Sequence, residues 1–389
     1  MRREIAVSGD VLEGPLVVGG GLAGAAVATL LARGGERVTL VEQYPEPRHK
    51  MCGEFLSAEA CESLLGMGLD VRALGALPVR RLRLAGGGAC VEEALPFEAW
   101  SLTRRVLDEA MLEMAAASGV AVRRGERVEA LTADAGVWRV RMSRGEEMCA
   151  RDVFVASGKH DVRGHARPEG PQGSLIAFKQ YFRLTKEQCA ELWGGIELML
   201  FRGGYAGIQM VEGGCANMSL LVEARRYKEL GGGWSSLLTA MKAESKQIRR
   251  RLGGAEAMLE RPLSLSRIPY GFLRRATSES GLWFLGDQAA VIPSFSGDGM
   301  SIALHTARVA AEVYLGGLPA EDLTRRLCAE LGGLMWRATT LSRMMVSGAG
   351  QSAVCGAAWV MPSLLRRAAA ATRIPAAATA RLRAVAVTG

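Results

Sequence analysis

The sequence has few of the residue patterns that bind metal ions or form disulfides. It contains eight cysteines and four histidines in 389 residues. No two cysteines form a Cys-x-x-Cys pair, and the histidines do not cluster with them. We therefore predict neither a metal site nor a disulfide framework. Reduced thiols are typical of the cytoplasm, which is the location we expect.

Long apolar runs and basic–aromatic stripes are also missing. The first ten residues are charged and lack an apolar core, so we expect no signal peptide. No uninterrupted apolar run is long enough for a membrane span. The net charge is +8, but the basic residues are scattered in pairs and only 6% of residues are aromatic. This composition argues against nucleic-acid binding and favours an anionic ligand or an acidic carrier protein.

A glycine-rich turn follows the first predicted strand, which ends in two valines. Gly19, Gly21 and Gly24 have the spacing G-x-G-x-x-G and precede an apolar helix. Gly19 allows a tight turn, Gly21 allows a pyrophosphate to approach the backbone, and Gly24 allows the helix to lie close to the sheet. Leu22 and Ala23 begin the helix, whose free N–H groups suit phosphate oxygens. The pattern predicts a dinucleotide site.

An acidic residue stands where such a site requires one. A second predicted strand, residues 37–41, is followed by Glu42, whose carboxylate is placed to accept hydrogen bonds from ribose hydroxyls. Gln43 follows it and is assigned to the same site. The alternative is a structural strand–helix–strand unit with an ordinary surface glutamate. The agreement of strand, glycines, helix and acid in order and spacing favours the dinucleotide.

A second motif lies far along the chain. Gly286 and Asp287 end a further apolar strand, and Gly297 and Gly299 precede an apolar helix at 302–315. A carboxylate just past a strand suits a ribityl or ribose hydroxyl. The turn offers N–H donors to an electron-rich oxygen, as flavin sites require where negative charge accumulates on reduction. Taken alone, an aspartate that caps a helix is an equally good reading.

The two motifs in this order resemble the superfamily of flavoprotein monooxygenases and geranylgeranyl reductases, which has the para-hydroxybenzoate hydroxylase fold. The resemblance implies FAD as cofactor. It also implies an α/β fold: a Rossmann-like FAD-binding domain, an inserted antiparallel-sheet substrate domain and a helical C-terminal tail. We assign residues 1–172 and 276–325 to the FAD-binding domain, 173–275 to the substrate domain and 326–389 to the helical C-terminal region.

The resemblance also implies roles for individual residues. Arg104 matches an arginine that contacts the FAD phosphates, Asp287 matches the ribityl ligand, and Gly297 lies in the turn beneath the isoalloxazine. The predicted FAD-binding residues are Gly19, Gly21, Leu22, Ala23, Gly24, Glu42, Gln43, Lys50, Cys52, Gly53, Arg104, Val128, Gly286, Asp287, Gly297, Gly299 and Met300. The predicted catalytic residues are Cys52, Pro293 and Gly297.

Two segments resemble the geranylgeranyl-reductase branch in particular. Residues 50–53, Lys-Met-Cys-Gly, are similar to its K-x-C-G segment, which lies near the flavin ring. Cys52 is then a polar group beside the flavin, or alternatively a small buried thiol. Residues 204–206, Gly-Tyr-Ala, are similar to a second segment of that branch. However, Gly207 stands where the branch carries an aromatic residue, and its Phe-Pro is absent.

The leading prediction is an FAD-dependent monooxygenase that hydroxylates a hydrophobic or aromatic small molecule, such as a polyketide-type secondary metabolite. The alternatives are a flavin-dependent reductase or dehydrogenase of the geranylgeranyl reductase type, and a non-catalytic flavin-bound scaffold. Many aromatic hydroxylases carry Asp-Gly where this chain has Ser157-Gly158. The reductant, NAD(P)H or another donor, is therefore left open. The tryptophan motif of flavin-dependent halogenases is not visible.

The substrate pocket is expected between the inserted sheet and the FAD-binding domain. Phe178, Gln180, Tyr205 and Gln209, on predicted strands, are candidate lining residues. The expected partners are a hydrophobic small-molecule substrate, a reductase or carrier protein, and a membrane surface that the C-terminal region contacts.

Overall fold

The structure is a computed structural model, and it describes residues 11–276, 279–375 and 378. Its first layer is a parallel sheet with the strand order β18–β10–β1–β2–β6 in the described part of the chain. Residues of the three central strands are almost completely buried, as expected for a parallel sheet covered on both faces. The strands are β1 (Leu16–Val18), β2 (Thr39–Glu42), β6 (Ala121–Arg124), β10 (Val153–Val155) and β18 (Leu282–Phe284).

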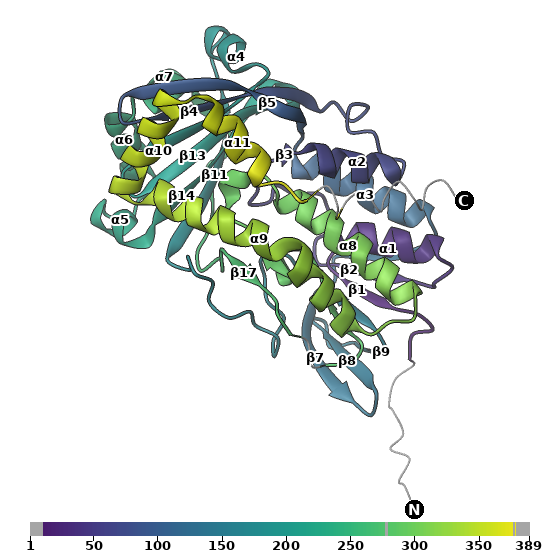
Figure 1. Cartoon of the computed structure of the whole chain (residues 1–389). Helices are drawn as coiled ribbons and strands as arrows, with labels where there is room; N and C mark the ends of the chain where they lie inside the picture. Colours follow the sequence, from purple (N-terminus) through teal and green to yellow (C-terminus); the bar gives the residue numbers. More distant parts are fainter. Residues whose placement is uncertain (1–10, 277–278, 376–377, 379–389) are drawn as a thin grey trace, which may run out of the picture.

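Helices cover one face of this sheet and a small antiparallel sheet covers the other (Figure 1). The helical face buries Leu31, Phe154 and Trp283, and the last two rings stack with their centroids 5.2 Å apart. The helices are α1 (Leu22–Arg33), α2 (Ala58–Gly66), α3 (Arg104–Ala117) and α8 (Gly299–Leu315). The small sheet comprises β7 (Val128–Asp134), β8 (Val137–Met142) and β9 (Glu147–Ala150).

A larger, mainly antiparallel sheet forms the second domain. Its long strands are β4 (Leu77–Gly86), β5 (Ala89–Ser101), β11 (Leu175–Arg183), β12 (Gly195–Phe201), β13 (Gly204–Val211) and β14 (Cys215–Glu223). The short strands β3 (Phe55–Leu56), β15 (Glu256–Ala257) and β16 (Leu263–Leu265) extend it. Strand β4 pairs in parallel with β12. The hairpin at 77–101 therefore joins this sheet, although it lies within the first range assigned to the FAD-binding domain.

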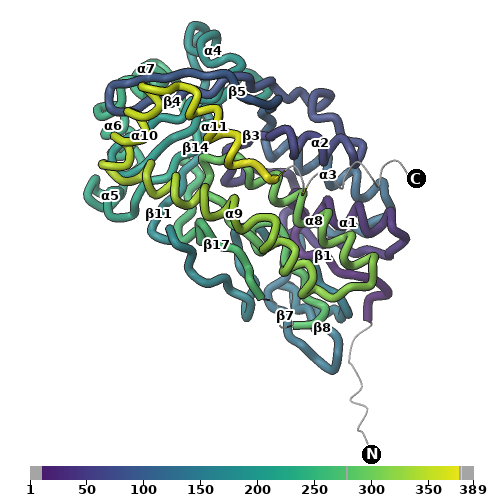
Figure 2. Tube along the Cα trace, viewed as in Figure 1, coloured from purple at the N-terminus to yellow at the C-terminus, as the bar shows by residue number. Residues whose placement is uncertain are grey.

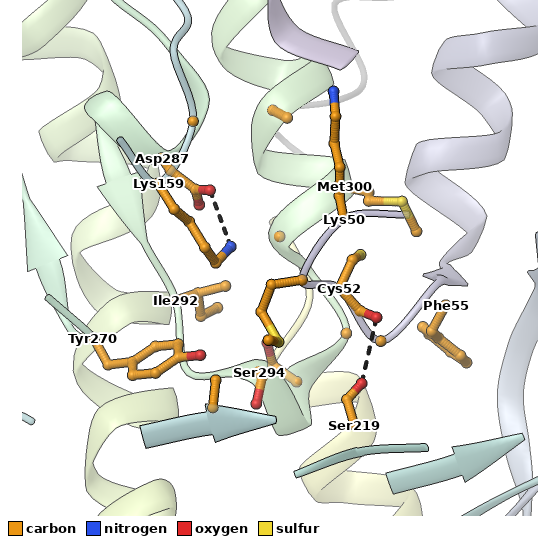
Figure 3. A pocket seen from close by; sticks show the side chains of 18 of the residues that line it. Lys50, Cys52, Phe55, Lys159, Ser219, Tyr270, Asp287, Ile292, Ser294 and Met300 are labelled. Carbon is orange, nitrogen blue, oxygen red and sulfur yellow. Dashed lines mark hydrogen bonds and ion pairs between the residues drawn. The ribbon is translucent and has the colours of Figure 1, made fainter. Parts of the chain in front are cut away.

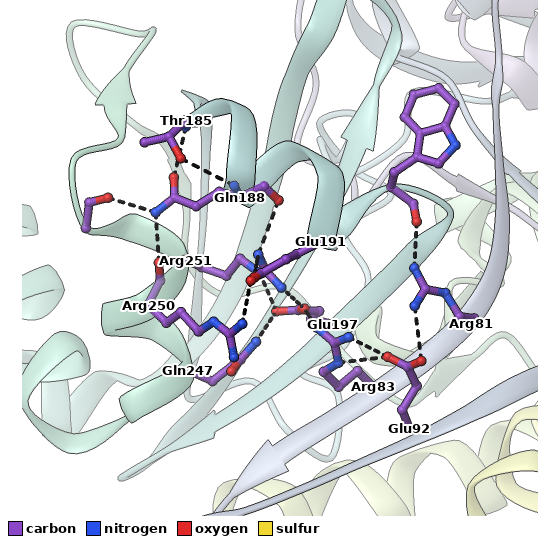
Figure 4. A network of polar contacts seen from close by, with 12 residues as sticks. Arg81, Arg83, Glu92, Thr185, Gln188, Glu191, Glu197, Gln247, Arg250 and Arg251 are labelled. Carbon is purple, nitrogen blue, oxygen red and sulfur yellow. Dashed lines mark hydrogen bonds and ion pairs between the residues drawn. The ribbon is translucent and has the colours of Figure 1, made fainter.

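Short helices pack on the outer face of the large sheet. They are α4 (Lys186–Leu192), α5 (Ala224–Glu229), α6 (Trp234–Glu244) and α7 (Lys246–Leu252). A buried ionic network fixes α7 to the sheet (Figure 4). Arg251 is fully buried, and its Nη2 lies 2.6 Å from Oε1 of Glu197 on β12. Arg83 of β4 pairs with the same carboxylate, so three elements share one charge cluster.

The C-terminal region consists of α9 (Ala320–Val346), α10 (Gly348–Val360) and α11 (Ser363–Ala371). Helix α9 packs against α8 of the FAD-binding domain and continues to the large sheet. Helices α10 and α11, yellow in Figure 2, lie across the β4–β5 hairpin. None of the helices in the described ranges is long and apolar enough to cross a membrane.

The predicted fold is confirmed: a Rossmann-like parallel sheet, a separate antiparallel sheet and C-terminal helices. The remaining strands, β17 (Phe272–Leu273) and β19 (Ala290–Val291), pair with each other. Ahead of β1, the structure describes residues 11–15. Within them, Val11 forms an isolated bridge with Cys149.

Candidate functional site

One large cavity, with a volume of about 1590 Å³, lies between the parallel sheet, the large sheet and helices α9–α11. Its wall includes the glycine turn after β1, the loop at 48–55 and the turn before α8. Of the predicted FAD-binding and catalytic residues, only Gly24 and Pro293 lie outside this wall. Residues predicted from two motifs far apart in sequence therefore line the same cavity.

Two cations flank the glycine turn. An ideal Cβ built on Gly21 would lie 3.4 Å from Nη2 of Arg104 and 3.6 Å from Nζ of Lys50. Asp108 holds both cations, with its carboxylate 2.8 Å from Nε of Arg104 and 2.8 Å from Nζ of Lys50. Burial favours the protonated acid, but the two cations lower the pKa of Asp108. Two cations on one carboxylate leave a net positive charge, which suits a pyrophosphate.

Two glycines of the turn, Gly19 and Gly24, have no room for a side chain. Gly19 has φ +104°, and a Cβ on Gly24 would lie 1.8 Å from the Gly19 oxygen. Gly24 therefore shapes the site from behind the cavity wall. Glu42 closes the turn, since its Oε2 accepts a hydrogen bond of 2.7 Å from the Gly20 N–H. Its carboxylate lines the cavity beside Gln43, where it can also accept bonds from a ribose.

The second motif touches the first. A Cβ on Gly286 would lie 3.2 Å from Cβ of Ala23 in the first turn of α1. Next to it, Asp287 forms an ion pair of 3.1 Å with Lys159 (Figure 3). Burial opposes ionisation, but Lys159 and Arg167 lower the pKa of Asp287. The group at this position is thus an ionised acceptor, as a ribityl hydroxyl requires.

The turn before α8 contributes Gly297, Gly299 and Met300 to the cavity wall. Gly297 has φ +72°, and a Cβ there would lie 2.5 Å from the ring of Phe55. Gly299, at the start of α8, has open space where a Cβ would stand. Pro293 lies behind the wall, and its carbonyl oxygen accepts a 3.0 Å hydrogen bond from Oγ of Ser296. Its role here is to shape the turn.

The loop that carries Cys52 is fixed to the large sheet through its carbonyl oxygens. Cys52 O accepts a hydrogen bond of 3.3 Å from Oγ of Ser219 (Figure 3). Three further side chains of the sheet bind the carbonyl oxygens of the adjacent loop residues: Lys179 with Lys50 at 3.0 Å, Asn217 with Gly53 at 2.8 Å, and Gln209 with Glu54 at 2.8 Å. Cys52 is thereby held in the cavity wall by neighbours from three strands.

Sequence reasoning missed the buried cluster beneath this loop. Glu54 adopts φ +61° and is completely buried. Its Oε1 lies 2.6 Å from Nζ of Lys179 and accepts hydrogen bonds from the Tyr181 hydroxyl at 2.7 Å and the Arg104 N–H at 2.9 Å. Burial lowers the pKa of Lys179 and raises that of Glu54. The available signal was Lys179, which directly follows the apolar run Leu-Ile-Ala-Phe in the middle of β11.

The part of the cavity away from the glycine turns is apolar. It is lined from the sheet and from the C-terminal helices by Leu82, Leu84, Leu198, Leu221, Leu265, Leu341, Met345, Val354, Ala358 and Leu365. Tyr205 and Gln209 line the cavity as predicted. The prediction was wrong for Phe178, whose ring packs on Tyr227 of α5 at the outer face of the large sheet, and for Gln180, which binds the backbone of Leu259. Side chains alternate along a strand, and these two point to the other face.

Comparisons with known proteins agree with this site. Residues 15–153 match the family described as the FAD binding domain. The chain is 27% identical over 328 residues to the menaquinone reductase of Mycobacterium tuberculosis. The aligned region covers 80% of this chain and 77% of that protein.

Two solved structures show the same fold. The myxobacterial chondrochloren halogenase CndH superposes with a TM-score of 0.75 at 18% identity, over 97% of both chains. PqsL of Pseudomonas aeruginosa, described as a probable FAD-dependent monooxygenase, gives a TM-score of 0.69 at 18% identity, over 90% of this chain and 99% of that one.

Residues 15–153 therefore form an FAD-binding domain, and the chain has the same fold as this halogenase and this probable monooxygenase. The resemblance inferred from the two motifs is confirmed for the FAD-binding domain and for the fold. The residues present fit the cofactor: a cationic cradle at Gly21, an acceptor at Asp287 and open space at Gly299, where α8 begins.

Proposed function

We propose that the protein is an FAD-dependent monooxygenase that hydroxylates a hydrophobic, ring-bearing small molecule. Its FAD site and its apolar chamber form one cavity, so a substrate in the chamber meets the cofactor directly. When bound, reduced FAD supplies the electrons that activate oxygen or reduce a substrate. The chain's own residues bind the substrate, orient it and exclude water.

The observation that carries this proposal is the unfilled space beside Gly207 in the cavity wall, called the open floor below. Gly207 lines the cavity, and an ideal Cβ there meets only the Ser219 oxygen, at 3.9 Å. In the Cys52 loop, a Cβ on Gly53 would meet only Oγ of the same Ser219, at 3.8 Å. The missing aromatic side chain leaves space beside the Cys52 loop. This space suits the ring of a substrate.

A polar group is available to orient such a ring. Gln209 is buried in the cavity wall and donates through Nε2 to the carbonyl oxygens of Gly53 and Glu54. Its Oε1 has no hydrogen-bond partner among the described residues. A buried acceptor without a partner is costly, and a phenolic hydroxyl would satisfy it. Around it, helices α9–α11 close the apolar chamber and exclude water from the reacting atoms.

Isotope labelling tests the proposal. The reduced holoprotein is mixed with ¹⁸O₂ and a panel of alkyl-substituted phenols and quinones, and the products are analysed by mass spectrometry. We expect one labelled oxygen atom in the product and oxygen uptake that depends on the substrate. Consumption of oxygen to peroxide alone, with every substrate unchanged, would contradict the proposal, and a flavin that never cycles would favour the scaffold alternative.

A second candidate is a flavin-dependent reductase, because the Cys52 loop lines the cavity and a menaquinone reductase is among the relatives. In this case reduced FAD would saturate a substrate double bond without oxygen. The two candidates separate in an anaerobic experiment with polyprenyl quinones. A saturated product formed without oxygen supports the reductase, and its absence together with labelled aerobic product supports the monooxygenase.

The remaining partners are also proposals. We propose NAD(P)H or a reductase protein as electron donor, and a cytoplasmic location.

Contact of the C-terminal region with an anionic membrane surface is supported by Trp359, Val360 and Met361, which are exposed at the end of α10. Arg366 and Arg367 follow on α11 and complement anionic headgroups. Co-sedimentation with anionic and neutral vesicles tests this contact.

A further inference from the structure

The C-terminal segment returns to the FAD-binding domain after α11. Thr372 and Ile374 are buried, and Ile374 packs in the core that contains α1 and α8. Between them, Arg373 is 9% exposed and lines the cavity. Arg373 lies 77 residues beyond Ser296 of the turn before α8. The segment after α11 thus places a cation in the wall of the cofactor site.

Arg373 contacts the turn that is expected to lie beneath the isoalloxazine. Its Nη2 donates to the carbonyl oxygen of Ser296, and its Nη1 lies 2.9 Å from Oδ1 of Asp298. The guanidinium also lies 5.0 Å from the ring centroid of Phe97 and 5.8 Å from that of Phe55. Two polar contacts and two aromatic faces fix its position.

The charge that Arg373 balances is a buried one. Asp298 is completely buried and directly precedes α8. Neither of its oxygens has a well-aligned hydrogen bond in the described part of the chain, and Arg373 is its ion-pair partner. An uncompensated carboxylate here would repel the negative charge that a flavin gains on reduction. The cation removes this repulsion.

We propose that Arg373 is a positioning residue for FAD reduction: it neutralises Asp298 and so cancels a buried negative charge at the turn at 296–299, and the C-terminal segment thereby helps to set the reduction potential of the flavin. This inference rests on the FAD site of the proposed function and holds for a monooxygenase and for a reductase alike. It assigns the segment after α11 an electrostatic role in addition to closing the cavity.

Four variants separate this role from loosening of the segment. Arg373→Met removes the charge and keeps the length of the side chain, whereas Arg373→Lys keeps the charge. Asp298→Asn removes the opposing charge. Arg337→Met is the matched control, because Arg337 Nε also binds the segment, at the carbonyl oxygen of Ala371 (2.9 Å), away from the turn.

The measurements are the dissociation constant of oxidised FAD and the midpoint potential of the bound flavin, above neutral pH. For Arg373→Met we expect the dissociation constant of reduced FAD, divided by that of oxidised FAD, to rise about tenfold. Such a rise lowers the two-electron midpoint potential of the bound flavin by about 30 mV. Asp298→Asn should raise the potential. Arg373→Lys and Arg337→Met should leave it nearly unchanged.

The proposal is overturned if Arg373→Met and Arg337→Met shift the potential equally, or if neither shifts it. Loss of oxidised FAD binding in both Arg373→Met and Arg373→Lys would also overturn it, because the residue would then be needed for structure. A shifted potential in a protein that hydroxylates no substrate would contradict the proposed reaction and leave this inference intact.

Discussion

Lys179 and Glu54 form an ion pair of 2.6 Å in which both side chains are completely inaccessible to solvent. Lys179 belongs to β11 of the large sheet, and Glu54 ends the loop that carries Cys52. The same Lys179 ammonium group donates to the carbonyl oxygen of Lys50 at 3.0 Å. One cation therefore fixes both ends of the loop that connects the FAD-binding domain to the large sheet.

Removing this cation should be strongly destabilising. In Lys179→Met, the Glu54 carboxylate stays buried without its counter-charge, so we expect a loss of about 3–5 kcal/mol in the free energy of unfolding. Urea unfolding measures it. Adding Glu54→Gln to Lys179→Met should recover part of the loss, because no buried charge then remains. Lys186→Met, at an exposed position on α4, is the control and should change stability by less than about 0.5 kcal/mol.

The glycine turn predicts a contrast between two glycine substitutions. In Gly24→Ala, the new methyl group would lie 1.8 Å from the Gly19 oxygen, so the helix must move away from the turn. We expect lower stability and FAD binding weakened at least about tenfold, about 1.4 kcal/mol. In Gly66→Ala nothing lies within 4 Å, and we expect unchanged FAD binding. Equal effects of the two substitutions would contradict the close packing of α1.

Asp298 predicts a pH dependence of stability. Burial raises its pKa from 3.8 to about 7, although Arg373 acts in the opposite direction, and Glu59 raises it further. Between these pH values the folded protein holds a proton that the unfolded chain releases. This stabilisation is complete below about pH 4 and is lost as the pH rises through about 7. In Asp298→Asn, unfolding measured across this range should show a smaller decline; parallel curves would contradict the assignment.

The open floor at Gly207 predicts a change of substrate range. In Gly207→Phe, an aromatic ring would occupy the space proposed for the substrate ring. We expect turnover of ring-bearing substrates to fall at least about tenfold, about 1.4 kcal/mol in kcat/KM, with unchanged FAD content. The matched variant Gly66→Phe, at an exposed position on α2 and outside the cavity wall, should leave turnover unchanged. Full activity of Gly207→Phe on ring-bearing substrates would contradict the proposed pose.

The sequence predicted the parts of the site that depend on local motifs. Gly21, Asp287 and Arg104 line the cavity because a strand, a turn and a helix start fix their positions within a few residues. Which side chains of β11 point toward the FAD-binding domain was not predictable. The alternation of Phe178 and Lys179 shows that the strand has two faces, but it does not show which face meets that domain. Arg373 was missed because its partner, Asp298, lies far away in sequence, and no local pattern marks such a pair.

The most direct test of the account is a titration of apoprotein with FAD, followed by flavin fluorescence, for the wild type, Gly21→Val and Asp287→Ala. The account predicts one FAD per chain in the wild type. It predicts no binding in Gly21→Val, whose side chain would meet Arg104 and Lys50 in the pyrophosphate cradle, and weaker binding in Asp287→Ala. A wild-type chain that takes up no FAD, or variants that both bind it as tightly as the wild type, would contradict a single flavin held by both turns.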